Sequence, residues 1–204
     1  MKLPLSIFLL FFVTITTHAQ IIHVPGDQPT IQAGIDAASD GDTVLADPGI
    51  YAEHINFNGK SITLASLCLV TSDTSYISQT VIDGDGWELP VVRAYMIEDS
   101  TTLLSGFTIR NSIGGGIFCE DAFVTIEHTR IINNSNWGDG MIGGFGGGIH
   151  NQGAMVLRNV EITGNHASWL GGGIFNAGDM VLENVNILNN SARIFGGGIY
   201  QYYK

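Results

Sequence analysis

The chain has few charged residues, and very few of them are basic. Charged side chains make up 13% of its 204 residues, and 8 Lys and Arg stand against 19 Asp and Glu, for a net charge of −11. Nucleic acids and anionic membranes bind through clustered Lys and Arg, so this balance argues against both as partners. A protein or a surface glycan is the partner that we expect.

Cysteine is also scarce, with Cys68 and Cys119 as the only two in the chain. Two cysteines without a spacing pattern do not form a disulfide framework. We expect two separate thiols in strand positions, each packed as a small apolar residue. A disulfide between them is the alternative if the chain enters an oxidising compartment.

Long apolar runs are missing except at the amino terminus. Lys2 precedes an apolar stretch over residues 3–15, and Thr17-His18-Ala19 offers small residues for cleavage before Gln20. This three-part pattern predicts a secretory signal peptide over residues 1–19. Because no later apolar stretch is long enough for a membrane span, we expect none in the mature chain.

A repeated unit dominates the second half of the chain. Residues 146–170 and 171–195 are consecutive copies of one unit, identical at fourteen positions, and a third copy opens at Gly196. An earlier copy begins at Gly114 and extends to Phe145, lengthened by an insertion around 136–143. Self-similarity at this period predicts a solenoid in which each unit buries its apolar face against its neighbours.

Within a unit, the apolar residues alternate as they do in β-strands. Val160-Glu161-Ile162-Thr163 alternates strictly, and Gly and Asn break the apolar clusters at 151–153, Asn159 and 164–165. Because no window keeps helical spacing, we expect three short strands per unit of ~25 residues, which make one coil of a parallel β-helix. Stacking should align Ile117, Ile149, Ile174 and Ile199, then Ile131, Ile162 and Ile187, and a ladder of Asn134, Asn165 and Asn190.

A short helix is expected at the amino-terminal end of the solenoid. Pro29-Thr30 opens a stretch in which Ile31, Ile35 and Ala38 fall on one face at helical spacing. Residues 20–50 are therefore predicted to cap the open end of the core, and residues 51–204 to form the coils.

These segments carry a resemblance. Residues 24–66, VPGDQPTIQAGIDAASDGDTVLADPGIYAEHINFNGKSITLAS, resemble the start of pectin-lyase-fold proteins, and the GGGI…NN units resemble the repeat of polymorphic outer membrane proteins. The resemblance implies an all-β fold, a right-handed parallel β-helix solenoid, in a secreted or bacterial cell-surface protein associated with the outer membrane. Relatives with more coils imply a partial chain here, with an open carboxyl end and possible edge-to-edge self-association.

One cluster of residues suggests chemistry. Asp83, Asp85 and Glu88 are candidate calcium ligands, and Arg93 follows them as the type of base that lyases of this fold use. Asp-Gly is equally common in turns, and the signature motifs of polygalacturonases and pectate lyases are missing. We therefore expect no catalytic residue and no cofactor, with a polysaccharide lyase or glycoside hydrolase as the alternative.

A row of rings is the one binding feature that the repeats predict. If the isoleucine stack points inward, strand alternation points its neighbours outward as an exposed ladder near two tryptophans. The ladder comprises Phe118, His150, Phe175 and Tyr200, and the tryptophans are Trp137 and Trp169. Such rings suit stacking on sugars or protein docking, although mutual stacking or cover by the 136–143 loop would explain them equally.

The expected function follows from these features. A secreted or cell-surface structural and interaction module, adhesin-like and without a catalytic site, fits the signal peptide and the repeats best. A carbohydrate-binding β-helix is the alternative, resting on the ring ladder and Trp137.

Overall fold

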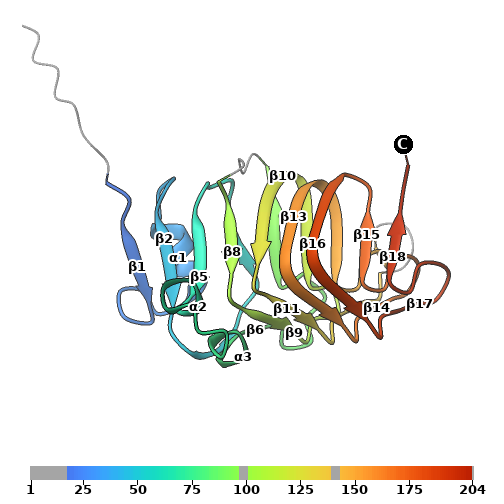
Figure 1. The fold of residues 1–204 in the computed structure, drawn as a ribbon, viewed down its shortest axis with the longest axis horizontal. Coiled ribbons are helices and arrows are strands. Elements are labelled where there is room, and N and C mark those ends of the chain that lie inside the picture. Colours follow the sequence, from blue (N-terminus) through green and yellow to red (C-terminus); the bar gives the residue numbers. More distant parts are fainter. Residues whose placement is uncertain (1–17, 97–100, 139–142, 204) are drawn as a thin grey trace, which may run out of the picture.

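The computed structural model describes residues 18–96, 101–138 and 143–203 (Figure 1). Residues 1–17 of the predicted signal peptide and part of the 136–143 insertion lie outside the described residues. The helices are α1 (Ile31–Ala37), α2 (Cys68–Thr71) and α3 (Tyr76–Gln79). None of the helices in the described ranges is long and apolar enough to cross a membrane. The strands are β1 (Ile21–Val24), β2 (Thr43–Ala46), β3 (Gly49–Ala52), β4 (Ile55–Asn56), β5 (Thr63–Ser66), β6 (Thr80–Asp83), β7 (Val92–Tyr95), β8 (Leu103–Ser105), β9 (Thr108–Arg110), β10 (Ile117–Glu127), β11 (Arg130–Ile132), β12 (Ser135–Asn136), β13 (Ile149–Thr163), β14 (His166–Ala167), β15 (Ile174–Asn176), β16 (Asp179–Leu188), β17 (Ser191–Ala192) and β18 (Ile199–Gln201).

The strands build a parallel solenoid. Every pairing between these strands is parallel, in one sheet of 15 strands and one of three. Along the long axis of the molecule, the strands follow one another from β1 at one end to β18 at the other (Figure 1). The mostly-β, parallel, solenoidal fold that the repeats predict is confirmed.

Like residues stack as the repeat predicts. Ile149 pairs with Ile174, which pairs with Ile199, and Ile162 pairs with Ile187. Ile149, Ile162 and Ile174 are fully buried, whereas Ile199 on β18 is 44% exposed. These side chains face the interior because strand alternation keeps one residue type on one side at every level.

A buried amide ladder fixes the register at one turn. The backbone N–H of Asn134 donates to Oδ1 of Asn165 (2.9 Å), and that of Asn165 donates to Oδ1 of Asn190 (2.9 Å). The side-chain amide of Asn165 also donates to the Ile131 carbonyl at 2.8 Å. Each residue that precedes the ladder has a positive φ, with Asn133 at 53°, Gly164 at 68° and Asn189 at 54°, because the chain turns sharply there.

Two local features differ from the sequence-based expectation. β13 is continuous over 15 residues across the predicted breaks, but the one at Asn159 persists as a turn (φ 52°), where Asn159 is skipped in the pairing with β16. In β10, a β-bulge between Glu120 and Phe123 shifts the register with β13, so that β10 carries an extra residue there. Pairing of the residues before and after Asn159 keeps β13 one strand across the turn.

The predicted helix packs at the amino-terminal end. Ile31 and Ile35 of α1 are buried in the core beside Val24 and Val44. The hydroxyl of Thr30 accepts from the backbone N–H of Ala33 and caps the helix. The helical spacing read from the sequence is therefore confirmed.

Both cysteines are buried thiols, as the first of the two alternatives expects, but only Cys119 lies in a strand. The strand position predicted for Cys68 is wrong, because Cys68 begins α2. The Cys119 thiol donates to the Ala122 carbonyl at 3.5 Å, in the bulge of β10. Burial is the main cause that raises the pKa of the Cys68 thiol above its usual range.

We predict that Asn165→Ala lowers the free energy of unfolding by roughly 2–4 kcal/mol, because it leaves the Asn134 N–H and the Ile131 carbonyl buried without these partners. Asn186→Ala, at an exposed position of β16, is the matched control and should change it by less than about 0.5 kcal/mol. Urea unfolding followed by circular dichroism measures both. Equal losses in the two variants would contradict a structural role of the amide ladder.

Candidate functional site

The predicted ring ladder forms in register and is longer than predicted. Phe118 pairs with His150, His150 with Phe175, and Phe175 with Tyr200. On the other side of Phe118, the row continues to Arg93 on β7. From the sequence we grouped Arg93 with the acidic cluster. The structure pairs Val92 with Ile117 and Arg93 with Phe118, so Arg93 belongs to the ring row as well.

The ladder is not exposed along its whole length, and this part of the expectation is wrong. His150 and Phe175 are buried, at 7% and 6% exposure. The ring of Phe145 lies 4.9 Å from that of Phe175 and 6.1 Å from that of His150, and the ring of Tyr202 lies 6.5 Å from that of Phe175. Aromatic side chains from outside the strands cover the middle of the row, which strand alternation alone does not predict.

A groove opens at the end of the ladder that carries Arg93 and Phe118. It has a volume of about 570 Å³, within the range of small-molecule sites. Its apolar lining comes from Leu89, Pro90, Ile113, Phe118 and Trp137, and its polar side chains come from Glu88, Arg93, Asn136 and His150. The groove therefore joins the predicted ring row to part of the predicted acidic cluster.

The segment that carries Glu88 is held by hydrogen bonds and close packing. The hydroxyl of Ser112 donates to the Leu89 carbonyl at 2.6 Å, and a ring nitrogen of His54 lies 2.9 Å from the Pro90 carbonyl. Gly114 packs directly on this segment, since a Cβ there would lie 2.5 Å from the carbonyl carbon of Glu88. A side chain at this position would therefore force the backbone at Glu88 or at Gly114 to shift.

Trp137 also lines the groove, and the residue before it is held by hydrogen bonds. The Asn136 side chain donates to the Phe145 carbonyl (2.9 Å) and accepts from the backbone N–H of Gly144 (2.8 Å). The indole of Trp137 lies 4.7 Å from the His166 ring, yet 59% of the residue is exposed. The tryptophan is thus oriented by the protein while its surface stays accessible.

Arg93 lies at the floor of the groove against aromatic rings. Its guanidinium carbon is 6.0 Å from the ring centroids of both Phe118 and Tyr95, at the outer limit of a cation–π contact. The four ion pairs among the described residues involve Arg110, Arg130 and Arg158. Neither Arg93 nor Glu88 takes part in one, so the hydrogen-bonding groups of both side chains are available to a ligand.

The three calcium candidates are not brought together. The Asp83 carboxylate accepts from Arg110 Nε and Asn111 Nδ2, both at 2.8 Å. Burial raises the pKa of Asp83, but these hydrogen bonds and the Arg110 charge outweigh burial and hold the pKa below its usual value. Asp83 and Asp85 both line a smaller cavity of about 170 Å³ beside His54, whereas Glu88 lines the groove. Among the described residues, no group of three or more His, Cys, Asp or Glu side chains is placed to hold a metal ion.

Trp169, predicted to lie near the ring ladder as a binding residue, packs against Phe145 instead. Its ring lies 6.1 Å from that of Phe145, edge to face, so it supports the cover over Phe175 and does not line the groove. Ile113 and Gly114 are groove residues that sequence reasoning missed. The pairing of Gly114 with Asn136 is an antiparallel bridge outside the repeat register, which the repeat pattern does not reveal.

His150 makes folding depend on pH. Burial lowers its pKa from 6.5 to about 4, and the Gln152 side-chain amide lies 2.9 Å from its Nε2, where a neutral ring accepts. Above pH 6.5 both folded and unfolded chains carry a neutral ring. Between pH 6.5 and about 4 only the unfolded chain takes up the proton, so stability falls as the pH falls, by on the order of 3 kcal/mol.

We predict that His150→Phe loses less stability than the wild-type chain between about pH 7.5 and about pH 4.5, because phenylalanine does not titrate. Urea unfolding of both proteins at the two pH values measures the difference. The same loss in both would show that His150 is not the group responsible.

The chain was compared with protein-family models, curated proteins and solved structures, and none of them matches it. Its function therefore has to be inferred from its own residues and their geometry.

Proposed function

We propose that the chain is a secreted or cell-surface β-helix module, adhesin-like, that attaches to a carbohydrate-bearing partner through the groove beside Trp137. In this proposal the solenoid is right-handed, with three-strand coils, and the repeats are of the polymorphic-outer-membrane-protein kind. The observation that carries the proposal is the groove itself, in which an oriented, exposed indole faces a guanidinium and a carboxylate.

Sugar recognition suits these groups. The apolar face of a sugar ring packs against an indole or phenyl ring, and its hydroxyls pair with planar polar side chains at the edge of the site. Trp137 and Phe118 supply the rings, while Arg93 donates and Glu88 accepts. Strand pairing places Phe118, and the contacts of Asn136 and His166 place Trp137, so both rings are positioned before a ligand arrives, which lowers the entropic cost of binding.

Binding without bond cleavage is the mode that we propose. A glycoside hydrolase uses a pair of carboxylates that flank the scissile bond. Glu88 is the one carboxylate among the described residues that line the groove. Asp83, the strongest acidic candidate in the sequence, is already engaged by Arg110 and Asn111.

The test is a glycan array probed with the purified chain and with Trp137→Ala. We expect saturable binding to at least one glycan, weakened about tenfold or more by Trp137→Ala through loss of ring stacking. Trp87→Ala is the matched control, because Trp87 is 61% exposed but lines the smaller cavity beside His54, and it should bind normally. Binding to no glycan, or undiminished binding by Trp137→Ala, would overturn the proposal.

A further inference from the structure

The charges in the groove restrict the chemistry of its ligand. Among the described residues that line it, Glu88 carries a negative charge and Arg93 a positive one, so the two cancel. His150, at the inner end, adds no positive charge at neutral pH because burial lowers its pKa to about 4. The groove therefore offers one cationic donor group and one anionic acceptor group without a net charge.

The surrounding field disfavours an anion further. The chain carries a net charge of −11, so a negatively charged ligand approaches against the long-range potential of the protein. An acidic sugar would gain a contact with Arg93 but would face Glu88 across the same groove. Hydroxyl groups match both side chains, because a hydroxyl accepts from a guanidinium and donates to a carboxylate.

We propose that the groove binds an uncharged saccharide, packed on Trp137 and Phe118 and hydrogen bonded by Glu88 and Arg93, and that it rejects acidic glycans. This inference rests on the proposed function and adds the ligand class to it. Glu88 sets the specificity: its carboxylate accepts hydroxyl protons from a neutral sugar and repels the carboxylate of a uronate.

The backbone at Glu88 is held next to the groove. Gly114 packs closely on the Glu88 backbone, and the Ser112 hydroxyl donates to the Leu89 carbonyl. The Glu88 side chain therefore starts from a fixed point in the groove lining, and an acidic ligand in the groove would lie near its negative charge.

The experiment uses the full chain and hexaoses of mannose, galactose, xylose and glucose, with oligogalacturonate as the acidic probe, in titration calorimetry. We expect a neutral hexaose to bind at least about tenfold more tightly than the acidic one. Its affinity should stay constant when ionic strength rises from about 0.05 to about 0.5 M, because no ligand charge is screened.

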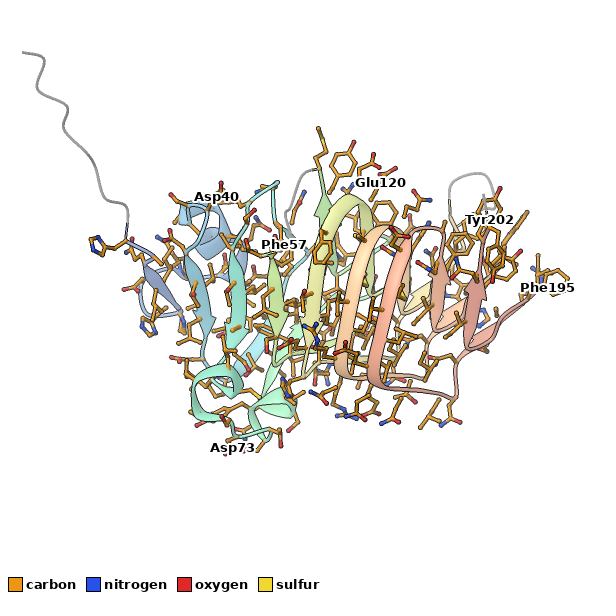
Figure 2. All side chains as sticks on the ribbon, turned by 45° about the horizontal axis from the view of Figure 1, so that its top comes forward. Asp40, Phe57, Asp73, Glu120, Phe195 and Tyr202 are labelled. Carbon is orange, nitrogen blue, oxygen red and sulfur yellow. The ribbon has the colours of Figure 1, made fainter. Side chains whose placement is uncertain are left out.

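Two variants with the same change of net charge distinguish a direct role of Glu88 in the groove from an effect of the net charge of the chain. Glu88→Gln should weaken binding of the neutral hexaose about tenfold and improve binding of the acidic one. Glu120→Gln, on β10 and outside the groove lining, should change neither (Figure 2). Both positions retain some exposure to solvent, so folding should be preserved in both.

The outcomes are distinct. Binding of the acidic hexaose alone, salt-dependent and lost in Arg93→Gln, would overturn this inference and leave the proposed function standing. Equal effects of Glu88→Gln and Glu120→Gln would also overturn it. Binding of no hexaose would overturn both proposals.

Discussion

Hydrogen bonding at a constant register between successive parallel strands is the constraint on which the rest of this structure depends. A solenoid has no long-range core of the globular kind, since each unit buries its apolar face against the units on either side. The amide ladder at Asn134, Asn165 and Asn190 joins its members through both backbone and side chain, so a slip of one residue would break several buried hydrogen bonds together. Isoleucine stacking and the alignment of the rings follow from the same register.

Much of the fold is predictable because two consecutive copies of the repeated unit give the register when they are aligned. The partners of Ile149 and Ile162 follow directly from the alignment of the two consecutive copies, and the structure pairs them so. The cap helix is predictable from local signals at Thr30 and Ile31. Local sequence correctly indicates the turn at Asn159, but it does not indicate that pairing resumes on both sides of the turn, so that β13 continues through it.

The site is less predictable than the fold because it forms where the repeat is interrupted. The alignment of units places Phe118, His150 and Phe175 in one row and matches Phe145 with Leu170, but it does not indicate that the ring of Phe145 covers two members of the row. The groove arises from the segment around Glu88, which precedes the repeats, and from Asn136 and Trp137, which open the insertion. Contacts between irregular segments follow no period, so no period reveals them.

The fixed register also makes the length of the solenoid independent of the residues that line the groove. Each unit beyond Leu170 pairs with the one before it in the register of the repeat, and none of its described residues lines the groove. Parallel strands lie about 4.8 Å apart. Adding or deleting one such unit would therefore lengthen or shorten the solenoid by about 4.8 Å and leave every contact of the groove intact. The number of repeats can therefore change by whole units while the lining of the groove stays the same.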